Sequence, residues 1–173
     1  MISTVLGNLL RFVVLLLLQV LLLDHLDVGN GWVVPYLYVL FIIMLPFETP
    51  PWATLALGFL TGLVMDYFSS TPGMHTSACV LAAYVRVQTL RLLAPREGYE
   101  FGKRPTIPHM GLAWFITFAA VIVVAHHLWL FFVEVYRFDH FFSTFFRALT
   151  SAAATLVLCL LTQAITTRDL RTR

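Results

Sequence analysis

The chain has 173 residues, of which 60% are hydrophobic and 12% charged, and its formal net charge is +2. A mean hydropathy of +0.85 is far above the range of soluble domains and excludes that class. The small net charge gives no indication of nucleic-acid binding. We therefore expect a single polytopic membrane domain over residues 1–173.

Several apolar runs approach the roughly 20 residues that an α-helix needs to cross the hydrocarbon core of a bilayer. The first run is continuous and lacks a small-residue cleavage site, so we expect it to stay as an anchor. The second run is short, and Pro35 and Pro46 leave its ends irregular. The prediction is an all-α bundle of six transmembrane helices. Its spans are residues 5–23, 32–46, 52–68, 73–93, 110–133 and 142–165.

The basic residues predict the orientation of the bundle. With six spans, one side collects Arg11, Arg86, Arg91, Arg96, Lys103, Arg104, Arg168, Arg171 and Arg173. The other side holds only Arg137 and Arg147, beside Asp24, Asp27, Asp66, Glu134 and Asp139. The positive-inside rule then places both termini and the polar loop 94–109 in the cytoplasm. The basic set assigned to this loop is Arg86, Arg91, Arg96, Lys103 and Arg104, and it either only orients the chain or also contacts anionic lipids or a cytoplasmic protein.

A stripe of small residues crosses the third span. Gly58, Gly62 and Asp66 follow each other at intervals of four, so they share one face of a helix. Glycines at this spacing let a second helix approach closely in lipid, which predicts a packing groove for the helix of a partner protein. The candidate helix-packing and partner-contact residues are Gly58, Gly62, Asp66, Gly73, Ala82 and Tyr84.

Asp66 leaves three interpretations open. It lies near the end of the third span, where it either caps the backbone at the start of the fourth helix or contacts a partner. A proton or ion reaction would require a second group within reach, and His75 across the turn is the nearest candidate.

The remaining chemistry-bearing residues point away from catalysis. His126 and His127 are adjacent, so their side chains diverge by about 100° on a helix and do not chelate one ion as an i, i+4 pair does. Cys79 and Cys159 lie in apolar runs without metal spacing and are expected to pack as small buried residues. No phosphate loop, nucleophile elbow or metalloprotease motif occurs. We expect no enzyme activity, no metal and no cofactor.

Several local patterns are distinctive together. They are Leu45-Pro46-Phe47-Glu48-Thr49-Pro50, Gly58-Phe59-x-x-Gly62-x-x-x-Asp66, Thr71-Pro72-Gly73-Met74-His75, Ala83-Tyr84-x-Arg86 and Ala94-Pro95-Arg96-Glu97-Gly98-Tyr99. With these patterns the chain resembles the rod shape-determining MreD family, in particular its Bacteroidetes versions, and the resemblance covers nearly the whole chain.

This resemblance implies a non-enzymatic protein of the bacterial inner membrane that takes part in cell-wall elongation. Its implied partners are an MreC-type single-span periplasmic protein, a RodA-type glycan polymerase, a penicillin-binding transpeptidase, an MreB-type filament and membrane lipids. The implied fold is similar to the substrate-binding component of energy-coupling-factor transporters. The alternative function is the substrate-binding component of a vitamin-type transporter, for which Asn8, Gln19, Asp66, His75, His126 and Glu134 are the candidate pocket residues.

Overall fold

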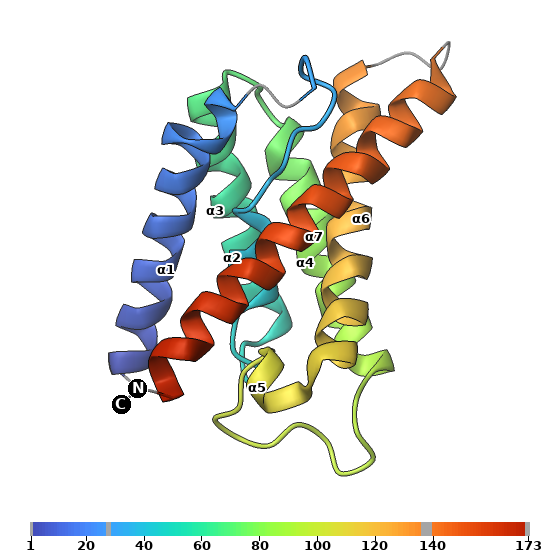
Figure 1. Cartoon of the computed structure of the whole chain (residues 1–173). Helices are drawn as coiled ribbons and strands as arrows, with labels where there is room; N and C mark the ends of the chain where they lie inside the picture. Colours follow the sequence, from blue (N-terminus) through green and yellow to red (C-terminus); the bar gives the residue numbers. More distant parts are fainter. Residues whose placement is uncertain (1, 27–28, 136–139, 172–173) are drawn as a thin grey trace.

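The computed structural model describes residues 2–26, 29–135 and 140–171, and the regular elements in these ranges are helices (Figure 1). The predicted all-α class is therefore confirmed. In chain order the elements are α1 (Ile2–Leu21), the 3-10 helix η1 (Leu23–His25), α2 (Val39–Ile43), α3 (Pro51–Ser69), α4 (Met74–Leu92), α5 (Ile107–Met110), α6 (Leu112–Val135) and α7 (Phe141–Arg171).

Four helical segments of the described chain are long and apolar enough to cross a membrane: Leu6–His25, Pro51–Ser69, Leu112–Val135 and Phe141–Thr166. Their outward faces expose large apolar side chains such as Leu10, Leu63 and Leu161, as expected for contact with lipid. Helix α4 matches α3 in length but carries Arg86 and Arg91, and it packs between α3 and α6. These findings support a multi-pass membrane protein.

The predicted helix over residues 32–46 is wrong for most of its length. Only the five residues of α2 are α-helical there, and the chain from residue 34 to residue 36 has no regular structure. Pro35 removes one backbone donor and keeps the preceding residue out of the helical region. The segment nevertheless lies in the centre of the bundle, since residues 37–45 are all at most 7% exposed.

Side chains from two long helices satisfy the backbone of this non-helical segment. The amide nitrogens of Val34 and Tyr36 donate to the hydroxyls of Ser151 (3.0 Å) and Thr155 (2.9 Å) on α7. On α1, Gln19 accepts from the amide of Leu37 (2.7 Å) and donates to the carbonyl of Pro35 (3.1 Å). Irregular backbone is tolerated at membrane depth only when protein groups bond it in this way.

The chain runs back and forth between two ends of the bundle (Figure 1). We call the end with residues 69–73 the turn end and the end with residues 94–109 the loop end. The start of α1 and the last turn of α7 both lie at the loop end (Figure 1). Of the charges behind the predicted orientation, Asp27, Arg137, Asp139, Arg173 and the side chains of Arg168 and Arg171 lie outside the described part of the chain.

Candidate functional site

The glycine stripe is covered by the protein's own fourth helix. A Cβ atom on Gly58 would lie 2.8 Å from Cβ of Ala83 and 2.9 Å from the carbonyl oxygen of Cys79. On Gly62 it would lie closest to Cα of Thr76 and 2.5 Å from the carbonyl oxygen of His75. The prediction of close helix packing is correct, but the predicted partner groove is wrong because α4 already fills it.

The other candidate contact residues divide between core and surface. Ala82 is 0% exposed and belongs to the hydrophobic core. Gly73 lies in the exposed turn that precedes α4, with a φ angle of +85°, which favours glycine. Tyr84 is 53% exposed on α4. Only Gly73 and Tyr84 of the set are therefore open to a partner.

Asp66 is a cap for α4, as one of the three interpretations predicted. Its carboxylate accepts hydrogen bonds from the backbone amides of Gly73 (2.9 Å), His75 (2.8 Å) and Thr76 (3.0 Å). It also accepts from the hydroxyls of Thr71 and Thr76. An anion at a helix N-terminus is stabilised by the exposed amides and by the helix dipole. The carboxylate meets the backbone of His75 and not its imidazole, so the pair required for proton chemistry does not form.

A buried polar cluster links three elements behind this turn. The Tyr38 hydroxyl lies 2.9 Å from Nδ1 of His75 on α4 and 2.9 Å from Nε2 of His126 on α6. The three side chains are at most 4% exposed. Nδ1 of His126 is buried without a hydrogen-bond partner, and Sγ of Cys79 lies 4.0 Å from its Nε2.

His127 belongs to a separate set of contacts. Its Nδ1 lies 2.8 Å from the carbonyl oxygen of Val123, and its Nε2 lies 3.0 Å from the hydroxyl of Thr155. The two adjacent histidines thus bond different partners, and the described residues contain no group of three or more ligands suited to a metal ion. Cys79 and Cys159 are both buried free thiols, as predicted.

A cavity of about 410 Å³ opens at the turn end, next to the cluster. We call it the turn-end pocket. Its polar lining comes from η1, the non-helical segment, the α3–α4 turn, α4 and α6, while apolar side chains complete the walls. The lining residues are Val20, Asp24, His25, Val34, Tyr36, Phe68, Ser69, Thr71, Met74, His75, Leu130 and Glu134.

The pocket brings together residues that looked scattered in the sequence. His75 and Glu134 were considered for a solute site, whereas Asp24, His25 and Tyr36 were not. Gln19 lies beside the pocket, because its Nε2 donates to the carboxylate of Asp24 (2.7 Å). Asn8 bonds Arg11 in the second and third turns of α1, far along the helix from this end. The sequence feature that could have indicated Tyr36 is a side chain with a hydroxyl directly after Pro35 in a mostly apolar run.

The loop end is held by contacts between two loops. The ring of Tyr99 stacks on Phe47 at 4.2 Å, and the Glu48 carboxylate accepts from the amide of Gly102 (2.6 Å). Burial raises the pKa of the Tyr99 hydroxyl, while the charge of Arg86 opposes this shift; the hydroxyl donates to the carbonyl of Leu90 (2.8 Å). Phe47, Glu48 and Tyr99 belong to the patterns that carry the family resemblance.

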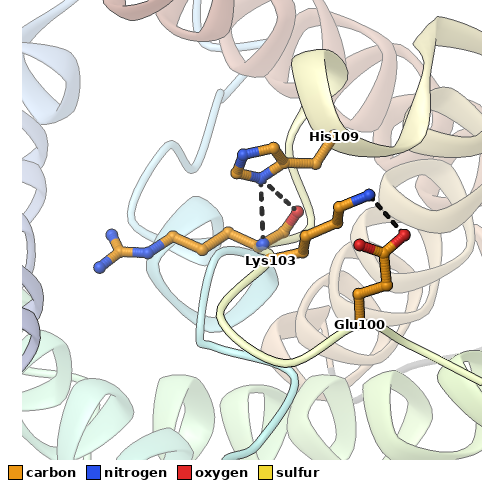
Figure 2. Close-up of polar contacts among 4 residues, drawn as sticks. Glu100, Lys103 and His109 are labelled. Carbon is orange, nitrogen blue, oxygen red and sulfur yellow. Dashed lines mark hydrogen bonds and ion pairs between the residues drawn. The ribbon is translucent and has the colours of Figure 1, made fainter.

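Polar contacts within the loop order its basic residues. Lys103 forms an ion pair with Glu100 at an N–O distance of 2.7 Å. Figure 2 shows this pair and the His109 ring, which faces the backbone that follows Lys103. Nδ1 of His109 accepts from the amide of Arg104 (3.1 Å). Arg91 and Arg96 are exposed. Arg91, Arg96, Lys103 and Arg104 remain candidates for contact with lipid or protein.

Arg86 does not belong to this basic loop, which corrects the prediction. It lies inside α4, is 1% exposed, and donates from Nη2 to the carbonyl oxygens of Leu45 and Pro46. Its Nε has no partner. Arg86 thus supplies a donor to the Leu45 carbonyl, which follows the short helix α2, and a second donor to the Pro46 carbonyl, which also accepts from the amide of Thr49.

Comparison with known proteins finds no relative of this chain. No family model, curated protein or solved structure matches the chain.

Proposed function

We propose that this chain is a non-enzymatic membrane scaffold of the MreD type in the bacterial cell-wall elongation machinery. The single observation that carries the proposal is the position of the residues behind the family resemblance. Phe47, Glu48 and Tyr99 tie the two loops at the loop end, and Asp66 fixes the turn at the other end. Residues in these positions define the shape of both ends of a bundle, which is what a scaffold presents to its neighbours.

In this proposal the protein lies in the inner membrane, with both termini and the loop 94–109 in the cytoplasm. An MreC-type single-span protein is the direct partner, and a RodA-type polymerase and a penicillin-binding transpeptidase belong to the wider complex. The MreB-type filament lies on the cytoplasmic side, where Arg91, Arg96 and Lys103 are available for contacts with lipid or protein.

The partner's helix docks on an outward face instead of the glycine stripe. Tyr84 is the candidate for this contact, because it exposes 53% of its surface, whereas the other α4 side chains up to Leu90 are buried or partly buried. An exposed tyrosine offers a large rigid surface and one hydroxyl that can bond a partner in lipid.

The test is purification of the tagged full-length chain from bacterial membranes, with identification of the subunits that come with it. We expect the MreC-type protein and the polymerase. A photoreactive amino acid at position 84 should crosslink to the MreC-type protein, whereas one at Leu17 on the exposed face of α1 should not. Recovery without any wall-synthesis subunit would refute the scaffold function.

The turn-end pocket favours a second candidate, the substrate-binding component of a small-molecule transporter. Its volume of about 410 Å³ is in the range of small-ligand sites, and it combines apolar walls with a few polar groups. Copurification with an energy-coupling ATPase, together with thermal stabilisation by a vitamin, would support this candidate over the scaffold.

A further inference from the structure

The turn-end pocket has an acidic rim and a floor of buried aromatic groups. Asp24 at η1 and Glu134 near the end of α6 are exposed at its mouth. His75 lines the interior although it is only 4% exposed, and the partly buried Tyr36 lies beside it, with ring centroids 5.4 Å apart. The four residues come from four different segments, so the pocket is a product of the tertiary fold.

Two polar groups of the floor have no hydrogen-bond partner among the described residues. Nδ1 of His75 is bonded to Tyr38, which leaves its Nε2 free on a side chain that lines the pocket. The Tyr36 hydroxyl likewise has no hydrogen-bond partner among the described residues, since the bonds of this residue run through its backbone amide and carbonyl. Neither atom is among the buried side-chain atoms left without a partner, which are Nε of Arg86 and Nδ1 of His126 in the described chain, so both are open to the pocket, where a ligand or water can bond them.

The hydroxyl of Tyr38 fixes how His75 presents itself to the pocket. This hydroxyl has one proton and two imidazole neighbours, so it donates to one ring and accepts from the other. When Tyr38 donates to His126, Nδ1 of His75 carries the proton and its Nε2 is an acceptor in the pocket. When Tyr38 donates to His75, the same Nε2 is a donor. A ligand that donates hydrogen bonds selects the first arrangement without placing a charge in the core.

The charges around the pocket favour a cation. Asp24 and Glu134 are negative, and their known contacts leave oxygens free: Asp24 accepts one bond from Gln19, and Glu134 has Arg147 at 3.8 Å. Among the described residues, Arg147 is the cation beside Glu134, and its guanidinium also lies 4.8 Å from the ring centroid of Phe131. The nearby carboxylate of Asp66 is saturated by its five donors.

We propose that the turn-end pocket binds a primary ammonium group carried on an apolar body. The ammonium group donates to Nε2 of His75 and to the rim carboxylates, and the body packs on Phe68, Leu130 and the Tyr36 ring. Carboxylates and aromatic faces are the groups that hold ammonium ions in proteins. The source is either a free amine or the ethanolamine headgroup of a lipid. The inference rests on the pocket alone and holds with either proposed function.

The experiment measures binding of 2-phenylethylamine to the purified full-length protein in phosphatidylcholine nanodiscs by calorimetry. The uncharged analogue 2-phenylethanol has the same shape and is the ligand control. We expect the amine to bind at least tenfold more tightly than the alcohol. Glu134→Gln and Asp24→Asn should each weaken the amine at least tenfold and leave the alcohol unchanged. Glu97→Gln, an exposed change in the loop at the opposite end, should leave both unchanged.

Nanodiscs that contain phosphatidylethanolamine distinguish the two sources. If a lipid headgroup occupies the pocket, the apparent affinity for 2-phenylethylamine should fall at least tenfold in them, and if the ligand is a free amine it should stay the same. Equal binding of amine and alcohol, no binding of either, or full amine affinity in both rim variants would overturn the proposal. None of these results bears on copurification with wall-synthesis subunits, so the scaffold function is tested separately.

Discussion

Substitution of Gly62 by alanine should separate the α3–α4 pair at its tightest point. The added methyl group would lie 2.5 Å from the carbonyl oxygen of His75 and 2.6 Å from the amide nitrogen of Thr76, whereas ordinary contacts measure 3.4–4 Å. Both obstructing groups are backbone atoms, so no side-chain rotation relieves the overlap. The first turn of α4 must therefore retreat by roughly 1 Å.

This movement also reaches the Asp66 cap. The amides of His75 and Thr76, which lie 2.8 Å and 3.0 Å from the carboxylate, belong to the same turn that must move. A retreat of about 1 Å takes both beyond hydrogen-bond distance. Overpacking costs about 1–3 kcal/mol, and each lost bond to a charged group adds about 1.5–3 kcal/mol. We expect a loss of at least about 4 kcal/mol in the free energy of unfolding, which is the lower end of this sum.

The measurement is reversible unfolding of the purified protein in mixed micelles with increasing SDS. Gly58→Ala should cost less than Gly62→Ala, because its closest obstruction is the Ala83 methyl group at 2.8 Å. Gly7→Ala in α1 is the matched control: its new methyl group would meet nothing within 4 Å, so stability should stay equal or rise slightly. If Gly62→Ala were as stable as Gly7→Ala, the assignment of this stripe to internal packing would be refuted.

Three further predictions concern single residues and the path of the chain. Asp66→Asn should lower the free energy of unfolding by about 3 kcal/mol, since an amide accepts fewer bonds and turns its own donors toward the backbone amides of α4; exposed Glu97→Gln is the control. Arg86→Ala should cost about 3–5 kcal/mol because it opens a cavity and removes the donor of the Leu45 carbonyl, whereas exposed Arg91→Ala should be neutral, and equal losses would contradict the buried role of Arg86. In a background with Cys79→Ala and Cys159→Ala, an impermeant maleimide added to intact cells should label Pro72→Cys at the turn end but not Glu97→Cys at the loop end; the opposite pattern would reverse the orientation.

The long helices could be predicted from the sequence because run length in apolar residues is a direct consequence of membrane thickness. The predicted spans 52–68 and 73–93 differ by no more than one residue at each end from α3 and α4. The cap by Asp66 was also within reach, since a carboxylate followed by a turn and a new helix is a local arrangement. Both features depend on residues that are near neighbours in the chain.

The extended course of residues 34–36 could not be predicted, because its cause lies far away in sequence. The hydroxyls of Ser151 and Thr155 that bond this backbone are 117 and 119 positions away, and Gln19 is in another helix. Hydropathy treats a buried extended segment and a buried helix alike. The buried position of Arg86 was missed for the same reason. The carbonyls to which it donates are 40 and 41 positions away, and they follow the early end of α2.

The glycine stripe shows how one pattern supports two different assemblies. Close approach of helices in lipid requires small residues whether the second helix belongs to the same chain or to a partner. Here α4 takes that place, and Gly62 sets its depth against α3 at the residues that Asp66 caps. The same turn of α4 carries His75, whose ring bonds Tyr38 and faces the turn-end pocket. The stripe therefore sets the position of the pocket floor, and for the amine site proposed above a change at Gly62 should weaken amine binding and stability together.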